Sequence, residues 1–283
     1  MAKFSQSWYA SIVQGKNNTN SADAIYSKVP VMPWIHHRLH PLLEKLFMKL
    51  GIARTLREGE KIFSSKEKVD HVVLVTKGVT GRAIGSTSGE TQAIALSTPG
   101  HIAAGNLNFF SGRPAAGHYF AVTKAEVVCV PQSILTGVAK QDRIINELLQ
   151  VQFELASLSD RVGFCCLSLL STEDKLKALT STWALNYGTM VYDNEGRKMI
   201  RMPVPLTRKY QVLVTNCSSV WLDKVLHKWI REKNWKRDGE FVLVNPELLE
   251  PFYLWIRGCM DEADSYNYPR TLAEQILFEE EQN

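Results

Sequence analysis

The stretch LTRKYQVLVTNCSSVWLDKVLHKW, residues 206–229, predicts a helix, a tight turn and a second helix. The turn falls around Asn216, because asparagine tolerates the left-handed backbone conformation that such a turn requires. Ser218 is suited to cap the second helix, since a serine oxygen accepts a hydrogen bond from a backbone N–H of the first turn. Helical periodicity directs one set of residues inward: Leu222, Val225, Leu226, Trp229 and Ile230. It directs another set outward: Ser219, Val220, Asp223, Lys224, His227 and Arg231.

The sequence on both sides of this stretch completes a small domain. KRDGEFVLVNP, residues 236–246, supplies a turn at Asp238–Gly239 and then a strand. Before the stretch, residues 172–188 predict a helix that ends at Gly188, and VYDNEGRKMIRM, residues 191–202, predicts a hairpin. The order of these segments predicts a winged helix-turn-helix.

Residues 52–131 have a different pattern, made of short β-branched runs separated by Gly, Pro and Ser. Examples are HVVLVTKGVTGRAIG at 71–85, TQAIALSTPG at 91–100 and AEVVCVP at 125–131. Strands at this spacing indicate a sandwich or barrel. A helix from about Pro41, which Gly51 ends, precedes them.

A long helix follows the strands and carries apolar residues at alternating spacings of four and three. The residues between them are mostly polar, so the apolar stripe is narrow. This heptad pattern is typical of two helices that coil together, and we expect a homodimer. The alternative is a helix buried within its own domain, which would show a broader apolar face. The predicted dimerisation residues are Ile144, Leu148, Val151, Leu155, Leu158, Val162, Cys165 and Leu169.

Length and composition suit a globular protein of about two domains, with 283 residues of which 45% are hydrophobic and 22% charged. No window approaches the roughly 18 uninterrupted apolar residues of a membrane span, and the first residues do not have the pattern of a secretory signal. The five cysteines are scattered without a CxxC motif, which favours a reducing cytoplasm over a disulfide framework.

Charge is unevenly distributed along the chain. Residues 197–240 hold 11 Lys or Arg and 4 Asp or Glu, whereas residues 241–283 hold 2 basic and 9 acidic residues. A basic block attracts polyanions, although a solvated helix face beside a solvated tail is an equally simple explanation. We expect the apolar part of PELLEPFYLWIRG, residues 246–258, to pack on the winged domain, and the acidic end around Glu279–Glu281 to compete with a bound polyanion.

Taken together, these segments resemble the Crp/Fnr superfamily of bacterial transcription regulators over about residues 50–245. The resemblance is carried by VDHVVLVTKG at 69–78, PGHIAAGNLNFF at 99–110, LSDRVG at 158–163 and the stretch at 206–229. It implies an α+β fold with an N-terminal jelly-roll-like β-roll sensor domain, a long dimerisation helix and a C-terminal winged helix-turn-helix. The expected domains are a flexible N-terminal extension at 1–35, a helix plus the β-roll at 36–135, the dimerisation helix at 136–170, the DNA-binding domain at 171–245 and an acidic tail with a helix at 246–283.

The loop GNLNFFSGRPAAGH, residues 105–118, matches the family's phosphate-binding cassette in shape. In cyclic-nucleotide-binding members, a Glu follows the leading Gly and binds the ribose, and an Arg followed by Ser or Thr binds the cyclic phosphate. The leading Gly corresponds to Gly105 here. Here Asn106 replaces the Glu, and Ala115 and Ala116 replace the other pair if the loop is one residue shorter. The resemblance therefore implies a degenerate pocket that does not respond to cyclic AMP, because the charge-assisted phosphate contact is lost.

The sequence also offers no clear ligand set for the other sensor groups that the family uses. Iron–sulfur versions need N-terminal cysteines, and no cysteine precedes Cys129. Haem versions need an axial ligand, for which His71, His101 and His118 are the candidates. An i, i+4 pair in the HHRLH segment at 36–40 is a weak metal candidate without a carboxylate or cysteine beside it. We therefore expect no metal and no cofactor.

DNA contacts follow from the same resemblance. Thr207, Arg208 and Lys209 are expected at backbone phosphates. On the recognition helix the predicted DNA-binding residues are Ser218, Ser219, Val220, Lys224 and His227. Val220 suits a thymine methyl group and Lys224 a guanine or a phosphate. Asp223 between them should weaken binding, and the departure from the family's usual residues puts its usual half-site in doubt.

The resulting hypothesis is a homodimeric, cytoplasmic DNA-binding transcription regulator that is not an enzyme. Its expected partners are double-stranded DNA, a second copy of the chain and RNA polymerase, with no membrane. Two alternatives remain open. A cupin-type metalloenzyme would need histidines and a carboxylate clustered on neighbouring strands, and the candidate histidines lie far apart in sequence. A Crp-like protein that has lost specific DNA binding would act through protein–protein interaction instead.

Overall fold

The computed structural model describes residues 31–86, 91–203 and 207–264. Within them the chain forms two compact units. The first, called the roll unit, comprises Val31–Thr182 together with Leu206–Val225. The second, called the wing unit, comprises Trp183–Pro205 and the chain from Leu226 onward. The acidic end around Glu279–Glu281, where competition with a polyanion was predicted, lies outside the described residues.

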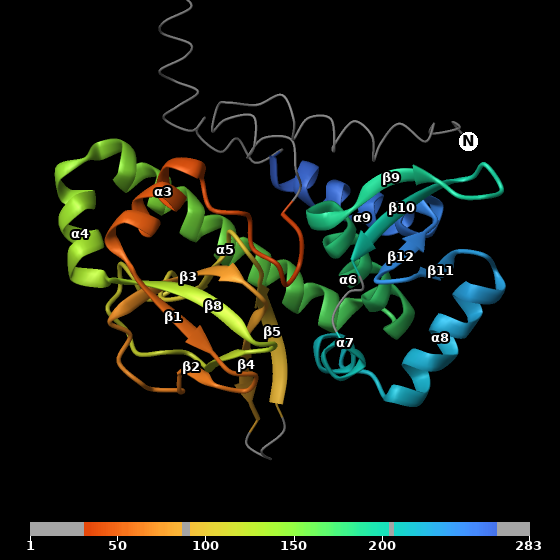
Figure 1. The fold of residues 1–283 in the computed structure, drawn as a ribbon, viewed down its shortest axis with the longest axis horizontal. Coiled ribbons are helices and arrows are strands. Elements are labelled where there is room, and N and C mark those ends of the chain that lie inside the picture. The colour runs from red at the N-terminus through yellow and green to blue at the C-terminus, as the bar shows by residue number, and fades with distance from the viewer. Residues whose placement is uncertain (1–30, 87–90, 204–206, 265–283) are drawn as a thin grey trace, which may run out of the picture. The chain divides into compact units, whose positions relative to one another are not determined.

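The roll unit contains two four-stranded antiparallel sheets, as the short β-branched runs predict (Figure 1). Their facing sides share a core of mostly small and β-branched residues, such as Val73, Val75 and Ala104, together with Tyr119. The order β1-β8-β3-β6 forms one sheet and β2-β7-β4-β5 the other. The strands are β1 Ile52–Leu56, β2 Lys61–Phe63, β3 His71–Lys77, β4 Thr80–Gly85, β5 Thr91–Ser97, β6 Ile102–Ala104, β7 His118–Ala121 and β8 Ala125–Pro131.

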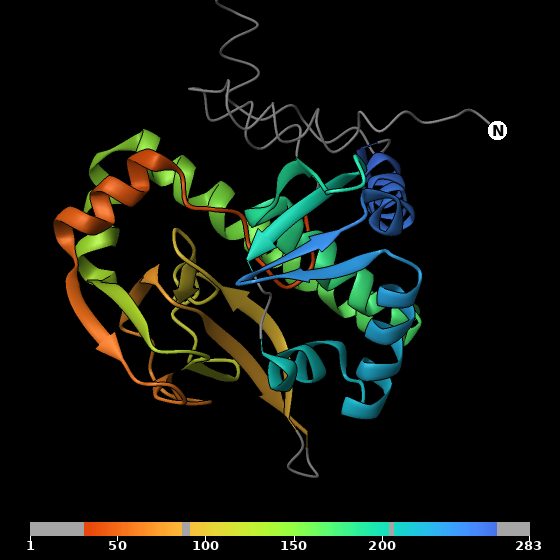
Figure 2. The ribbon, with the colours of Figure 1, turned by 45° about the vertical axis from the view of Figure 1, so that its right-hand side comes forward.

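Three helices pack on the roll around a second core. They are α3 Pro41–Leu50, α4 Gln132–Gln141 and α5 Arg143–Leu169, and they bury Leu43, Phe47, Leu135, Leu149 and Phe153 against β3 and β8. Both ribbon views place α3 and α4 at one end of the roll (Figures 1 and 2). The α3 helix starts at Pro41 as predicted, and it ends at Gly51, where a Cβ would lie 2.2 Å from Val128 Cγ1.

The long helix begins later than the predicted boundary at residue 136. Asp142 separates α4 from α5, because its carboxylate Oδ1 accepts a hydrogen bond from Ile145 N at 3.1 Å and caps the new helix. The α6 helix, Thr172–Tyr187, follows after a short break.

The predicted flexible extension at 1–35 is wrong for its last residues. Val31, Met32, Trp34 and Ile35 are buried in the roll unit, and Ile35 forms a parallel bridge with Leu96 of β5. Leu96 N donates to Trp34 O at 2.6 Å. Residues 31–40, called the strap, are therefore part of the folded unit.

The wing unit holds a four-stranded antiparallel sheet in the order β11-β12-β10-β9. Its strands are β9 Thr189–Tyr192, β10 Lys198–Pro203, β11 Trp235–Asp238 and β12 Phe241–Val244. The α9 helix, Pro246–Asp264, follows β12 and buries Leu249, Phe252, Tyr253 and Ile256 within this unit, as its apolar sequence predicts. The helix-turn-helix consists of α7 Arg208–Thr215, which belongs to the roll unit, and α8 Ser219–Arg231, which is divided between the two units at Val225.

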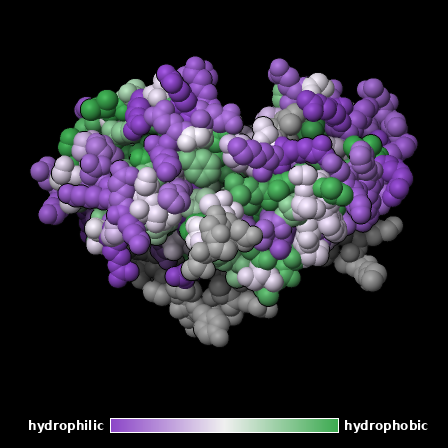
Figure 3. Space-filling view, turned by 90° about the horizontal axis from the view of Figure 1, so that it is seen from below, coloured by the Kyte–Doolittle hydropathy of each residue, from purple (hydrophilic) through white to green (hydrophobic). Residues whose placement is uncertain are grey.

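The face drawn in Figure 3 is largely hydrophilic, with hydrophobic residues in patches between hydrophilic ones. Among the described residues, no helix combines the length and the apolar character needed to cross a bilayer.

Candidate nucleic-acid interface

The turn between α7 and α8 has the geometry that the sequence predicts. Asn216 adopts the left-handed conformation, with φ 52° and ψ 48°, and its N–H donates to Val212 O. Ser218 Oγ accepts from Trp221 N at 3.2 Å and caps α8. This contact gives Ser218 a structural role in addition to its expected place among the DNA-binding residues.

One face of α8 is buried and the other is open. Leu222, Val225 and Trp229 are buried as predicted, and Leu226 is half-buried. Ile230 was predicted to face inward, and this is wrong: its side chain is 51% exposed near the end of the helix. The exposed residues of α8 are Ser219, Val220, Trp221, Lys224, His227, Ile230 and Arg231.

Trp221 is a surface feature that periodicity did not single out. It is 42% exposed and lies next to Val220, which is 66% exposed, in the first turn of α8. A large apolar side chain at the surface often marks a contact site. The first turn of α8 thus offers apolar contact area, while Lys224, His227 and Arg231 follow it along the helix at spacings that place them on one face.

Asp223 does not stand alone on α8 as an uncompensated negative charge. Its carboxylate forms an ion pair with the guanidinium of Arg208 at the start of α7. The pair links the two helices of the motif and cancels the charge that was expected to repel DNA. The Arg208 guanidinium is consequently paired within the chain, whereas Thr207 and Lys209 are exposed beside it.

The end of α7, the first helix of the motif, is held by hydrogen bonds from β5. Gln92 of β5 donates from Nε2 to Leu213 O at 2.8 Å and to Val214 O at 3.1 Å, satisfying carbonyls at the end of α7. Tyr210 and Val214 are buried. Nothing in the local sequence identifies Gln92, because its partners lie 121 and 122 residues away.

The wing also forms as predicted. Gly239 has φ +60° in the turn between β11 and β12, a conformation that favours glycine. Lys236 and Arg237 are exposed on β11. Arg201 of β10 places its guanidinium carbon 3.8 Å from the centre of the Phe241 ring and its Nε 3.6 Å from Asp238 Oδ2. These contacts fix the base of the wing and leave its basic edge open.

On α5, the chain covers only one face of the helix. That face is buried by the strap and the roll and includes Ile145, Leu149, Phe153 and Cys166. The eight predicted dimerisation residues lie elsewhere: Ile144 is 62% exposed, Leu169 is 73% exposed, Cys165 is exposed, and Leu148, Val151, Leu155, Leu158 and Val162 are half-buried. An apolar stripe therefore remains along α5.

The cassette loop keeps its turn but uses its backbone amides internally. Gly105 has φ +90°, and a Cβ there would lie 2.2 Å from His71 O. Ala115 donates to Glu67 O at 2.8 Å, and Gly112 donates to Asn108 O at 2.9 Å. Asn106 and Ala115 are buried and Ala116 is exposed, so the predicted pocket residues do not line one open cavity.

The histidines that were metal or haem candidates are engaged individually. His40 Nδ1 accepts from Leu42 N and caps α3, and His71 Nδ1 lies 2.6 Å from Asp70 Oδ1. His118 Nδ1 accepts from Ser65 N, while His36 and His101 are buried in the roll unit. Across the described ranges, no group of three His, Cys, Asp or Glu side chains is placed to hold a metal ion.

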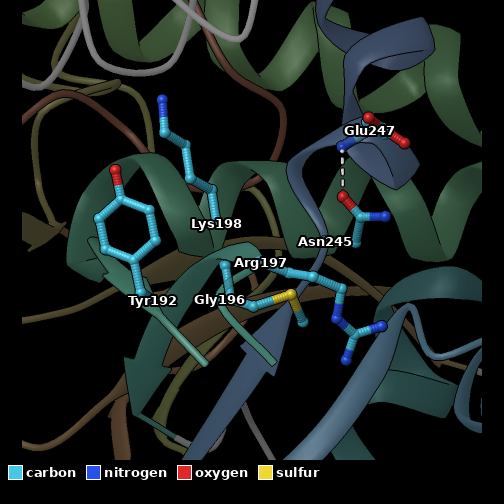
Figure 4. Close-up of a pocket in the computed structure, with 7 residues that line it drawn as sticks. Tyr192, Gly196, Arg197, Lys198, Asn245 and Glu247 are labelled. Carbon is cyan, nitrogen blue, oxygen red and sulfur yellow. Dashed lines mark hydrogen bonds between the residues drawn. The ribbon is translucent and has the colours of Figure 1, made fainter. Parts of the chain in front are cut away.

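A separate hollow of about 290 Å³ lies in the wing unit between the β9–β10 hairpin and the start of α9 (Figure 4). Two of its polar side chains, Arg197 and Asn245, already have partners. Arg197 binds Asp193 through Nη2 at 2.7 Å, and Asn245 Oδ1 accepts from Glu247 N at 3.1 Å. Hydrogen bonds within the hairpin hold the pKa of Asp193 below its ordinary value, with the backbone N–H of Arg197 as the main cause. These hydrogen bonds hold the hairpin and the start of α9 on either side of the hollow.

Solved structures match most of the chain. FixK2 from Bradyrhizobium japonicum superposes with a TM-score of 0.61 at 15% identity, covering 71% of this chain and 96% of FixK2. A CooA mutant from Carboxydothermus hydrogenoformans gives 0.60 at 13% identity, covering 77% and 99%. TTHA1359, a CRP/FNR-family transcriptional regulator from Thermus thermophilus, gives 0.51 at 14% identity, covering 70% and 98%.

At these identities the likeness establishes the fold. The chain has the α+β architecture of the Crp/Fnr regulators, and the predicted fold class is confirmed. No protein-family profile matches the sequence, and no curated protein matches it either.

Proposed function

We propose that the protein is a homodimeric DNA-binding transcription regulator of the Crp/Fnr type, and not an enzyme. The observation that carries this proposal is the open face of α8, with Lys224, His227 and Arg231 exposed behind a capped first turn. A helix of this kind fits the major groove, where its N-terminal residues meet base edges. Thr207 and Lys209 at the start of α7 suit backbone phosphates.

Dimer formation through α5 is supported by the apolar stripe that the chain's own packing covers only in part. The stripe repeats at heptad spacing over Ile144–Leu169, the geometry that two parallel helices need for knobs-into-holes packing. A dimer also presents two recognition helices to two half-sites, which is how such motifs bind DNA. A second copy of the chain is therefore the proposed partner for this stripe.

The proposed regulator does not respond to cyclic AMP. The only Lys or Arg of residues 105–118 is Arg113, which is exposed at the tip of the loop before Pro114. The N–H groups of Gly112 and Ala115 are engaged with carbonyl groups. Isothermal titration calorimetry with cyclic AMP and cyclic GMP should show no micromolar binding of either nucleotide.

The proposal places the protein in the cytoplasm, with RNA polymerase as a further partner once DNA is bound. The test is affinity capture of genomic fragments on the purified protein, followed by sequencing and footprinting of the enriched sites. A common sequence with two half-sites about one helical turn apart supports the proposal. Lys224→Ala should lose the enrichment, whereas Lys49→Ala on the exposed side of α3 should keep it. If the wild-type protein enriches no sequence, the chain has instead lost specific DNA binding.

A further inference from the structure

A charged pair is buried inside the roll unit, where it links β4 to α5. Arg82 on β4 has 6% of its surface exposed and donates from Nη2 to Asp160 Oδ2 of α5 at 2.6 Å. The two side chains are 7% and 9% exposed. Burying an isolated charge is strongly unfavourable, so each of these groups depends on the other for its place in the core.

Two further side chains complete the surroundings of this pair. The Arg82 guanidinium carbon lies 5.8 Å from the centre of the Tyr119 ring, and His36 Nε2 lies 3.2 Å from Asp160 Oδ1. Both carboxylate oxygens are thus engaged. Burial alone raises the pKa of Asp160, but hydrogen bonding to His36 and the charge of Arg82 outweigh it and leave the pKa lowered. The carboxylate is therefore ionised in the folded protein at neutral pH.

The pair lies beside the cassette loop. Tyr119 is directly opposite Arg82 in the β4–β7 pairing, and it shares the roll core with Ala115 of the cassette. Gly117, at the end of the cassette loop, packs so closely on β4 that a Cβ there would lie 2.6 Å from Ala83 O. The Arg82 guanidinium therefore lies between the Tyr119 ring and Asp160, one strand away from the residues that follow the cassette loop.

The strap closes the site from the other side. Ser159 Oγ donates to Met32 O at 2.6 Å, and Gln152 Nε2 donates to His37 O at 2.8 Å, so two hydrogen bonds hold the strap along α5. Trp34 is fully buried between them. Asp160 therefore contacts both the strap, through His36, and the roll, through Arg82.

We propose that Arg82 forms a carboxylate-binding site whose resident occupant is Asp160, so that α5 carries its own anionic ligand for the roll. The long helix is then held on the roll without a small-molecule anion. This assignment stands on the geometry of the pair alone. Its consequence, DNA binding that needs no small-molecule effector, rests on the proposed function.

The test removes the internal carboxylate and supplies an external one. Asp160→Ala leaves the Arg82 guanidinium unpaired in a space the size of a carboxylate, and formate is the probe that fits it. The melting temperature of Asp160→Ala should fall by several degrees and recover with formate in a saturable manner. Sodium chloride at the same ionic strength should give no recovery, because chloride lacks the two-oxygen geometry that a guanidinium binds.

Asp160→Asn is the matched control, since its amide fills the same volume and still contacts His36 and Arg82. Neither this variant nor the wild-type protein should gain stability from formate beyond the chloride control. If Asp160→Ala does not fold alone, folding is followed by circular dichroism across a formate titration. Formate-dependent folding supports the site, and a variant that stays unfolded at every concentration overturns it.

Two other results also overturn the assignment. One is an Asp160→Ala protein as stable as the wild type, and the other is equal gains from formate in all three proteins. DNA binding provides a separate arm: wild-type affinity for the captured site should not change with added formate, whereas Asp160→Ala should require it. If the wild type binds no DNA, the proposed function fails while the formate titration still decides the carboxylate site.

Discussion

The indole ring of Trp34 lies against Gly163 in the C-terminal half of α5. A Cβ at Gly163 would lie 3.1 Å from both Cδ1 and Nε1 of Trp34, closer than ordinary side-chain contact. Trp34 is fully buried with φ 64°, and its carbonyl accepts from Leu96 N. The ring is held by its backbone as well as its surroundings, so it has little freedom to move away.

We therefore expect Gly163→Ala to destabilise the protein. Replacing glycine inside a helix by alanine normally stabilises it by roughly 0.5–1 kcal/mol, but overpacking a filled core costs about 1–3 kcal/mol. The net loss should be about 1 kcal/mol in the free energy of unfolding, measured by urea denaturation. Gly137→Ala in α4 is the control, because nothing lies within 4 Å of its Cβ position and it should stabilise. A gain at both positions contradicts the packing described for the strap.

The stripe on α5 predicts that Leu155→Asp yields a monomer. A carboxylate at this position would be buried without a partner in the interface of a coiled-coil dimer. Sedimentation velocity should show the wild type as a dimer and the variant at half its mass, with DNA affinity lost as well. Gln150→Asp places the same charge on an exposed position of α5 outside the stripe and should leave the dimer intact. A dimeric Leu155→Asp protein would move the interface away from this stripe.

The ion pair between Arg208 and Asp223 predicts an effect of salt on DNA binding. Asp223→Asn frees the guanidinium for a phosphate, so affinity should rise for all sequences and the salt slope should steepen by about 1. Arg208→Ala should lower affinity for all sequences alike. Both side chains are exposed to solvent, and the stability of the fold should change by less than about 1 kcal/mol. Fluorescence anisotropy between 50 and 200 mM salt checks this.

Asp223 can affect DNA binding through its ion pair with Arg208 or through direct repulsion of the phosphates, and a double variant separates the two. In the Arg208→Ala background, Asp223→Asn should steepen the salt slope by much less than it does in the wild type. Equal steepening in both backgrounds would show that the carboxylate acts on DNA directly.

The helix-turn-helix was predictable because its signals are local. Asn216 and Ser218 act on the backbone within three residues, and the inward set of α8 follows from periodicity. The prediction for Ile230 was wrong because periodicity does not show where a helix extends beyond the residues that pack against it. The strap was missed for a different reason: His36 and Asp160 lie 124 residues apart, and no local pattern marks either of them.

The positions of Arg82 and Gln92 were harder to predict, because each is a polar residue whose partner lies far away in the sequence. Arg82 lies in the run TGRAIG of β4, where a charged residue is expected to point to solvent, and the structure buries it. Only a partner distant in sequence explains this burial. Gln92 is similar, since its amide caps a helix more than a hundred residues away.

His101 is the buried group whose titration should be visible in the stability of the protein. Its Nδ1 lies 3.0 Å from Thr98 O and 3.2 Å from Pro99 O, and because carbonyls only accept, Nδ1 carries the proton of the neutral ring. Burial, with a smaller contribution from the neighbouring His36 and His37, lowers the pKa of His101 to about 4, although hydrogen bonds to Thr98 and Pro99 oppose the shift. The folded protein therefore keeps this ring neutral well below pH 6.

The unfolded chain binds a proton at His101 near its ordinary pKa of 6.5, whereas the folded protein does so only near 4. The stability that this difference represents is fully present above pH 6.5 and is lost as the pH falls to 4. It amounts to roughly 3 kcal/mol. His101→Asn keeps an amide donor near the position of Nδ1 but cannot titrate. The unfolding free energy of the wild type minus that of this variant, measured by urea denaturation, should therefore decrease from pH 7 to pH 4. A constant difference across that range would show that His101 titrates alike in the folded and unfolded states.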